Sequence, residues 1–392
     1  MKLAIVFDGL QIGGIERVGI DYIRIFRNLG HDVTVFNLRP ELKAMECSID
    51  DSVRCARINF PRWLSPERYA AILKKAWWGK YIYPIAYIIT KLLNILYKPL
   101  LVIRNKYLRE SYDISIAFSG HINDLTFVAD SYIKAKYKIA WLHGALYGYV
   151  IISPSFLLLY KKIKNLVSLS NMCDTEFFRF FRENSINKKR IYNPIYIAEC
   201  EIDTHLVEQL KSKYGDFCLM VARFADDKDQ KTAIDAVCIL NKKYHFNKKL
   251  LLVGDGKNKK QLEIYVKKKK MSDNIIFMGS RLDVQNFYSA ASVYVHSSPL
   301  EGLPTVLLEA MTYHLPIAAT DSIPGVPEIL QNNKCGLISE VFDAEMLADN
   351  IYKIYTDKEL SNNLIANGTK KLNEFSPEFV QQQIEHFFNN LV

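Results

Sequence analysis

The chain has 392 residues, of which 49% are hydrophobic and 24% are charged, and its formal net charge is +9. This composition is that of a folded globular protein, and the length exceeds one typical core, so we expect two domains of about 190 residues each. The seven cysteines form no Cys-x-x-Cys pair and no zinc spacing, which argues for reduced thiols in a cytosolic compartment.

Short apolar runs alternate with amphipathic helical stretches, which is typical of parallel α/β sheets. A break near 193–213, where Asn193-Pro194 stops regular structure, separates two such series. We therefore predict two doubly wound sheets with ligands at the carboxyl ends of their strands, lining a cleft between the domains. The first apolar run is too short for a signal peptide and is expected to be a strand. The predicted strands are 3–7, 33–37, 114–118, 139–142 and 166–169, then 217–221, 250–253, 275–278, 293–296, 317–319 and 336–338.

The segment 57–110 holds eleven Lys or Arg residues against two acids, together with ten aromatic residues. Within it, Lys91, Asn94 and Lys98 interrupt an apolar run, 84–103, at helical spacing. We predict an amphipathic helix that lies on an anionic membrane surface rather than spanning it. The alternative is a helix buried in the domain core with snorkelling lysines. Nucleic acid is not expected as a partner, because no nucleic-acid-binding motif accompanies the patch.

The stretch 301–311 reads Glu-Gly-Leu-Pro-Thr-Val-Leu-Leu-Glu-Ala-Met. Its proline suits the first position of a helix, and the amides of Thr305 and Val306 follow without intrahelical partners. With the positive end of the helix dipole behind them, these amides form a phosphate site. Glu301 and Glu309 lie on either side and can bind hydroxyl groups, which suits a nucleotide sugar.

Other candidate residues follow predicted strands. Arg223 and Lys228 come after the strand 217–221, where two cations can clamp a diphosphate and stabilise it as it leaves. Gly13-Gly14 forms a phosphate-friendly turn or, alternatively, a tight turn that needs positive φ; the Gly-x-Gly-x-x-Gly fingerprint is absent. His143 ends a strand beside a glycine, so it either lines the predicted cleft or is structural.

The motif Glu-Gly-x-Pro-x-x-x-x-Glu-Ala-Met resembles the signature of the family-4 retaining glycosyltransferases, the glycosyl transferases group 1, which have the two-domain GT-B fold. The resemblance covers nearly the whole chain, densely from 217 to 340 and thinly from 40 to 135. It implies that Glu301 contacts the donor sugar, that Glu309 contacts the ribose, and that His143 lies beside the sugar without being the general base.

The resemblance extends to softer matches. Gly13-Gly14 corresponds to the loop whose amides approach the donor phosphate, and Gly279-Ser280-Arg281 to the loop that reads the nucleobase. Ser168-Leu-Ser170 and Asn193-Pro194 resemble the interdomain connection, and Gly254-Asp255-Gly256 is expected to be a turn with little direct chemistry.

The sequence also departs from the family pattern. Ala222 replaces a glycine before Arg223 without removing a cation, and His314 stands where the family has an αL-capping glycine. Histidine can adopt that conformation at some cost. The loop 321–325 is less glycine-rich than its family counterpart, which affects how the sugar ring is held.

We therefore predict an α/β protein of GT-B fold, with an acceptor-binding Rossmann-like domain at 1–195, a donor-binding Rossmann-like domain at 196–375, and a helix at 376–392 that crosses back to the first domain. The expected catalytic residues are Glu301, His143, Arg223 and Lys228. The expected donor-binding residues are Gly13, Gly14, Arg223, Lys228, Arg281, Glu301, Gly302, Thr305, Val306 and Glu309.

The predicted reaction is the retaining transfer of a hexose or N-acetylhexosamine from a nucleotide-diphosphate sugar, expected to be a UDP-sugar, to a glycan or lipid-linked glycan. No metal or other cofactor is expected, because the cations and helix amides stabilise the leaving diphosphate. Resemblance to bacterial members implies capsule, O-antigen, lipopolysaccharide or exopolysaccharide assembly, by a cytoplasmic protein peripheral on the inner face of the cytoplasmic membrane and contacting it through 57–110. The alternatives are an epimerase or phosphorylase on the same scaffold, or a non-catalytic GT-B partner subunit at the membrane.

Overall fold

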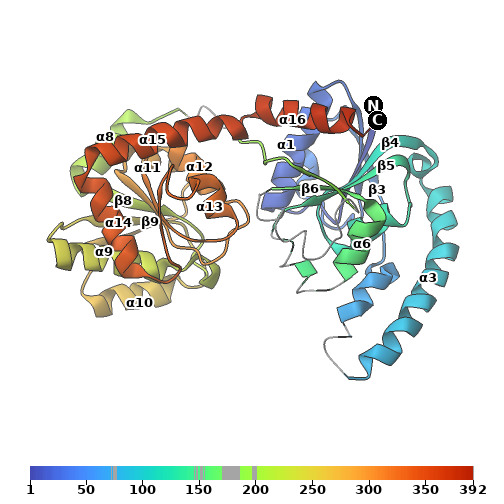
Figure 1. The fold of residues 1–392 in the computed structure, drawn as a ribbon, viewed down its shortest axis with the longest axis horizontal. Helices are drawn as coiled ribbons and strands as arrows, with labels where there is room; N and C mark the ends of the chain where they lie inside the picture. The colour runs from blue at the N-terminus through green and yellow to red at the C-terminus, as the bar shows by residue number, and fades with distance from the viewer. Residues whose placement is uncertain are drawn as a thin grey trace. The chain divides into compact units, whose positions relative to one another are not determined.

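The computed structural model describes residues 1–71, 73, 77–144, 146, 149–150, 153, 155–169, 186–196 and 201–391. The chain forms two compact units (Figure 1). The first unit contains Met1–Pro194 and Pro377–Val392, and the second contains Ile195–Ser376. Each unit is an α/β structure around one parallel sheet, so the predicted fold class is confirmed.

The first unit is built on a seven-stranded sheet with the order β3-β2-β1-β4-β5-β6-β7, in which every pairing is parallel. The central strand β1 contains an uninterrupted buried run, Leu3–Phe7, as expected for a parallel sheet that is covered on both faces. The strands are β1 (Lys2–Phe7), β2 (Asp32–Asn37), β3 (Arg54–Arg57), β4 (Ser111–Ala117), β5 (Lys134–Leu142), β6 (Asn165–Ser168) and β7 (Asn187–Arg190).

Helices cover this sheet, including the helix that ends the chain. Phe388 of the last helix stacks on Phe26 with ring centroids 5.6 Å apart, and Val380 and Ile384 join the same core. The helices are α1 (Gly14–Asn28), α3 (Gly79–Arg104), α4 (Ile122–Ala129), α6 (Ser155–Ile163) and α16 (Pro377–Asn389), with short 3-10 turns η1 (Glu46–Ser48), η2 (Arg62–Leu64), η3 (Pro66–Ala71) and η4 (Lys106–Arg109).

The strands predicted from the sequence are all present, with bounds that differ by a few residues, and the described residues contain two further strands that were not predicted. These are β3 and β7, which form the two edges of the first sheet. Their sequences, Arg-Cys-Ala-Arg and Asn-Lys-Lys-Arg, carry charges and lack an apolar run. Charged residues are typical of edge strands, because such residues keep the edge from pairing with other chains.

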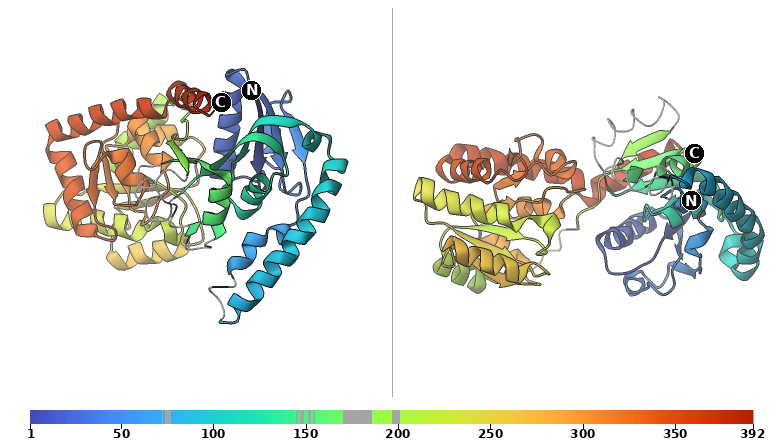
Figure 2. Two further views of the ribbon diagram at one scale, coloured as in Figure 1. Left: turned by 45° about the vertical axis from the view of Figure 1, so that its right-hand side comes forward. Right: turned by 90° about the horizontal axis from the view of Figure 1, so that it is seen from below.

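Helix α3 turns its polar residues inward and its apolar residues outward. Lys91 pairs with Asp130 at 2.6 Å, and the buried Asn94 donates to the carbonyl of Leu64 at 2.8 Å and accepts from the Tyr132 hydroxyl at 2.6 Å. Figures 1 and 2 show α3 at the edge of the first unit. Its exposed side chains include Tyr81, Ile82, Ile85, Ile88, Ile89, Leu92, Leu93, Ile95, Leu96, Leu100 and Ile103.

The alternative of a core helix is therefore wrong, since only 17% of the most apolar window of α3 is buried. The three polar residues do share one face, as predicted, but that face contacts the domain. The helix also continues through Pro84 and Pro99. It is long and apolar enough to cross a membrane by length and composition, a test that core helices of soluble proteins also pass.

The second unit has a six-stranded parallel sheet with the order β10-β9-β8-β11-β12-β13. Its strands are β8 (Phe217–Val221), β9 (Lys249–Val253), β10 (Ile275–Gly279), β11 (Val293–His296), β12 (Ile317–Thr320) and β13 (Leu337–Ser339). Its helices are α8 (Thr204–Tyr214), α9 (Gln230–Tyr244), α10 (Lys259–Lys269), α11 (Val284–Ala290), α12 (Thr305–Thr312), α13 (Gly325–Leu330), α14 (Ala344–Thr356) and α15 (Lys358–Leu372), with turns η5 (Asp226–Lys228) and η6 (Asn373–Phe375).

Candidate active site

Helix α12 presents its amino-terminal end at the carboxyl edge of the second sheet. The helix begins at Thr305, and Pro304 is its N-cap residue with extended backbone (φ −73°, ψ 100°) rather than its first helical residue. The amides of Thr305 and Val306 belong to the first turn, whose N–H groups have no acceptor within the helix. His314, just beyond the helix, has φ 54°, so it does adopt the αL conformation expected for a capping glycine.

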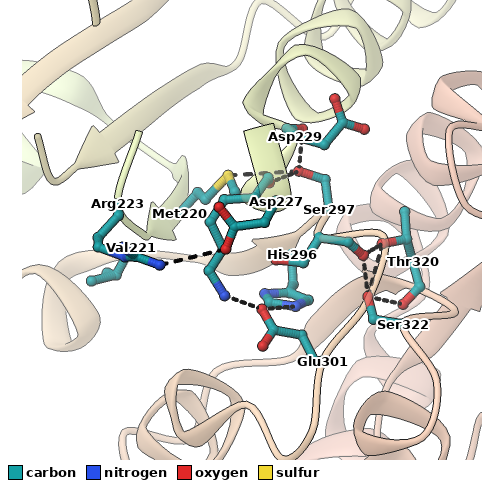
Figure 3. Close-up of polar contacts among 12 residues, drawn as sticks. Met220, Val221, Arg223, Asp227, Asp229, His296, Ser297, Glu301, Thr320 and Ser322 are labelled. Carbon is teal, nitrogen blue, oxygen red and sulfur yellow. Dashed lines mark hydrogen bonds and ion pairs between the residues drawn. The ribbon is translucent and has the colours of Figure 1, made fainter. Parts of the chain in front are cut away.

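Glu301, which Figure 3 labels, forms a direct ion pair with Lys228, a residue from a separate loop. The Lys228 ammonium lies 2.5 Å from Oε1 of Glu301, and both side chains are mostly buried. Arg223 is 76% exposed and lies 3.5 Å from the Asp227 carboxylate, a contact weak enough to leave it available to a ligand. A predicted phosphate-binding cation and a predicted sugar-binding carboxylate are thus in contact in the free protein.

Hydrogen bonds hold the backbone of the loop that carries Glu301. Ser297 donates to the carbonyl of Asp229 at 2.8 Å, and Thr320 donates to the carbonyl of Ser298 at 2.9 Å. The amide of Gly325 donates to the carbonyl of Glu301 at 3.1 Å. A Cβ atom on Gly325 would lie 2.7 Å from the carbonyl oxygen of Gly302, so glycine permits this close approach. Gly302 thus acts through its backbone.

Glu309 is oriented by a residue that sequence reasoning missed. Tyr288, a fully buried residue of α11, donates from its hydroxyl to Oε2 of Glu309 at 3.0 Å. Burial raises the pKa of Tyr288, so the phenol remains a donor. The tyrosine ring stacks on Tyr313 with centroids 5.6 Å apart. One oxygen of Glu309 is therefore fixed, which aims the carboxylate.

Gly254 and Gly256 shape the loop that carries Arg223. The left-handed φ of Gly254, +147°, brings its Cα close enough that an added Cβ would lie 2.0 Å from the carbonyl oxygen of Ala222. A Cβ on Gly256 would lie 2.4 Å from the carbonyl oxygen of Phe224. The Gly254–Gly256 turn therefore has an indirect role, because it fixes the backbone on both sides of Arg223.

Arg281 is placed differently from the other predicted cations. Its guanidinium forms two hydrogen bonds with Asp283, of 2.8 and 2.6 Å, and stacks over Phe287. Gly279, which precedes it, has φ +70° at the end of β10. Arg281 is thus committed to a local carboxylate, and nucleobase binding by this loop stays a prediction.

Gly13 and Gly14 lie at the start of α1 in the first unit. Gly13 has extended backbone (φ −166°), and Gly14 is not among the residues with positive φ, so the alternative of a turn that needs positive φ is wrong. A Cβ on Gly13 would lie 2.4 Å from Oε2 of Glu16. The Glu16 carboxylate thus folds back over the end of the helix, and it would have to move to make room for a side chain at position 13.

His143 follows β5, and its Nε2 lies 2.6 Å from the carbonyl oxygen of Phe118. Since a carbonyl only accepts, Nε2 carries the hydrogen and Nδ1 is the ring's acceptor. Burial lowers the pKa of His143 to about 4, so the ring is neutral near pH 7. A ring with so low a pKa is a weak base near pH 7, and the role of His143 beside the donor sugar stays a prediction.

A polar cluster at the carboxyl edge of the first sheet was also missed by sequence reasoning. Asp8, at the end of β1, lies 3.3 Å from Nδ1 of His121 and accepts from Asn123 at 2.7 Å. Hydrogen bonding to Asp8 raises the pKa of His121, whose side chain is half exposed. Burial raises the pKa of Asp124 to about 7, although this carboxylate accepts from the amides of Gly120 and His121.

His296 was also missed by sequence reasoning, and Figure 3 shows its ring next to the Glu301 carboxylate. It ends β11 and is 2% exposed, with Nε2 3.7 Å from Oε1 of Glu301. Among the described residues, neither of its ring nitrogens has a hydrogen-bond partner. Burial lowers the pKa of His296 to about 4, so the ring is neutral near pH 7. A signal did exist, because His296 follows an apolar strand just as His143 does.

The structure thus groups the predicted residues by unit. Arg223, Lys228, Glu301 and the start of α12 lie around the carboxyl edge of the second sheet, while Gly13, Gly14 and His143 lie at that of the first. Ser168 ends β6 and Asn193-Pro194 ends the first unit, whereas Ser170 lies outside the described residues. The cysteines at 47, 55, 218, 238 and 335 are free thiols, and those at 173 and 200 lie outside the described residues.

Residues 202–371 match the sequence family described as glycosyl transferases group 1. The second unit is therefore a group 1 glycosyltransferase domain. Solved structures extend the likeness to the fold of the whole chain. HepE of Anabaena in complex with UDP has a TM-score of 0.74 at 18% identity, and the lipopolysaccharide outer core galactosyltransferase WaaB has 0.71 at 15%; each alignment covers 100% of both chains. The chain thus has the GT-B glycosyltransferase fold.

Curated relatives of this glycosyltransferase domain include two bacterial enzymes. One is a Campylobacter jejuni α-1,4-N-acetyl-D-galactosaminyltransferase named for a diNAcBac-PP-undecaprenol-linked substrate, 24% identical over 196 residues, which are 50% of this chain and 52% of the relative. Another is the capsular polysaccharide biosynthesis glycosyltransferase CapM of Staphylococcus aureus, 24% identical over 208 residues, which are 51% of this chain and 53% of CapM. The chain spans about half the length of these relatives.

Proposed function

We propose that the chain is a retaining glycosyltransferase that moves a hexose or N-acetylhexosamine from a UDP-sugar to a hydroxyl of a glycan or lipid-linked glycan. The observation that carries this proposal is the site on the second unit, where Lys228 pairs with Glu301 on the loop that leads into α12. HepE crystallised with UDP supports uridine as the base. The names of the curated relatives support a role in capsule, lipopolysaccharide or other bacterial polysaccharide assembly.

In this proposal, positive charge stabilises the diphosphate as the glycosidic bond breaks. Arg223 is exposed and can swing to the ligand, Lys228 is released from Glu301, and the α12 amides supply fixed donors. Glu309, aimed by Tyr288, binds the ribose, and Glu301 binds the sugar. Retention would follow from same-face attack, in which the leaving phosphate accepts the proton of the acceptor hydroxyl.

We propose that neither a metal ion nor another cofactor is needed, because these cations and amides supply the charge that a metal provides elsewhere. The proposal is tested by thermal unfolding with UDP, GDP, ADP, UMP and NAD, each with EDTA. A ligand that binds the folded state raises the unfolding midpoint. Of the five nucleotides, only UDP should raise the unfolding midpoint. No shift with any nucleotide would contradict the proposal and would favour a non-catalytic partner subunit.

Stereochemistry and acceptor use separate the proposal from its enzymatic rivals. Sugar transfer to added glycosides, followed by NMR of the product, should show the anomeric configuration of the donor unchanged. An inverted product would contradict retention. Turnover of the donor without any acceptor would indicate an epimerase, and a strict need for inorganic phosphate would indicate a phosphorylase.

We further propose that the protein is cytoplasmic and binds the inner face of the cytoplasmic membrane through α3. The helix contains no acidic residue, carries Lys80 and Arg104 near its ends, and follows the exposed Trp77 and Trp78. The polar inner face of α3 is hydrogen-bonded to the domain, and the apolar side chains of its outer face are exposed to solvent. Basic groups and aromatic rings beside an apolar face fit an anionic bilayer.

A further inference from the structure

His296 lies beside the Lys228–Glu301 pair but takes no part in any hydrogen bond that the described residues offer. A buried polar group without a partner destabilises the folded state, so such a group in a site calls for an explanation. Other residues hold its neighbours on the loop, through the Ser297 hydroxyl and the carbonyls of Ser298 and Glu301. The imidazole is therefore not what holds the loop.

Donor binding would remove the ion-pair partner of the Glu301 carboxylate. In the free protein, Lys228 neutralises this carboxylate, which is 14% exposed. The diphosphate carries more negative charge than a carboxylate and competes for the same ammonium. When Lys228 moves to the diphosphate, Glu301 becomes a mostly buried charge without a partner, which is costly unless another donor replaces the lysine.

We propose that His296 is a positioning residue that takes over Glu301 when the donor draws Lys228 away. The inference rests on the proposed function. Nε2 of His296 is 3.7 Å from Oε1 of Glu301, so a shift of about 1 Å forms an ordinary N–H···O hydrogen bond. The neutral ring supplies the one N–H that this contact needs, without adding a charge that would repel Lys228. Glu301 then remains aimed at the sugar throughout the exchange of partners.

A double-mutant cycle on the full chain tests this exchange, with UDP as the probe. UDP lacks the sugar, so an effect of His296 on UDP affinity cannot arise from contacts with the sugar. H296F should weaken UDP binding, measured by calorimetry, about 10-fold, which corresponds to a lost buried hydrogen bond to a carboxylate. In the E301Q background the same change should weaken it less than about 2-fold, because a neutral amide needs no replacement donor.

Two further measurements keep the test decisive. H296Q retains an N–H donor and should restore most of the affinity that H296F loses. The unfolding midpoint of unliganded H296F should not fall, since the substitution removes unpaired polar atoms from a buried site. Equal losses in both backgrounds, or a lower midpoint with unchanged UDP affinity, would show that His296 only packs. If the unmodified chain binds no nucleotide, the proposed function itself fails, and the inference falls with it.

Discussion

The outer face of α3 gives the most direct test of membrane binding. Ile88, Leu92 and Leu96 lie at i, i+4 and i+8, so they share one face, and their exposed fractions are 58%, 57% and 69%. Full burial of such a side chain is worth about 1.5–3 kcal/mol, and roughly 60% of that, or about 1–2 kcal/mol each, remains to be gained from lipid. Changing all three to serine should remove about 3–5 kcal/mol, which corresponds to a loss of roughly 10²- to 4 × 10³-fold in vesicle partitioning.

The assay is flotation with anionic vesicles at low salt, repeated at high salt, where screening should weaken binding. The matched control is I264S/L282S, which removes two exposed apolar side chains (55% and 103% exposed) from the second unit. Both variants should unfold at the temperature of the unmodified chain, because the changed groups are exposed. Undiminished binding by the α3 variant would refute the assignment of its outer face, and absence of binding by the unmodified chain at low salt would refute the membrane proposal itself.

Three other changes test the sites. R223A should lower kcat about 10²–10³-fold, corresponding to about 2.7–4 kcal/mol, if the arginine stabilises the leaving group as an oxyanion donor does; a normal kcat removes it from the mechanism. G254A should lower the free energy of unfolding, measured by urea denaturation, by at least about 2 kcal/mol, because its Cβ would lie 2.0 Å from a carbonyl oxygen. The control G215A should cost less, since Gly215 also has positive φ but has open space around the added Cβ. D8N should lower the pKa of His121, measured by NMR. Asp8 raises the pKa of His121 in the folded state, so the pair stabilises the protein fully below about pH 6.5. This stabilisation is lost as the pH rises through the raised pKa, and D8N should abolish it.

The fold was predictable from the sequence because most strands are buried on both faces. Continuous apolar runs form β1, β8 and β9, as is typical of strands in a parallel sheet that is covered on both faces. β3 and β7 could not be found in this way. Each pairs with only one neighbouring strand, and their charged side chains resemble those of loops.

The site was predictable where one local motif carries it, as in the stretch from Glu301 to Glu309. It was not predictable where distant residues meet. Tyr288 reaches Glu309 across 21 positions, Asn123 reaches Asp8 across 115, and the Lys228–Glu301 pair joins residues 73 positions apart. The periodicity of the sequence does not indicate such pairs, because the packing of the whole sheet brings these distant residues together.

The placement of α16 has a consequence for the order in which the chain becomes foldable. Domains generally fold as units during synthesis, with the amino-terminal domain first. Here the second unit is complete once Ser376 has been made, whereas the first unit still lacks Val380, Ile384 and Phe388 of its core. The unit that the ribosome begins first is therefore the last to be completed. Until the final residues emerge, Phe26 stays without its stacking partner, and a short deletion at the end of the chain damages the unit at its beginning.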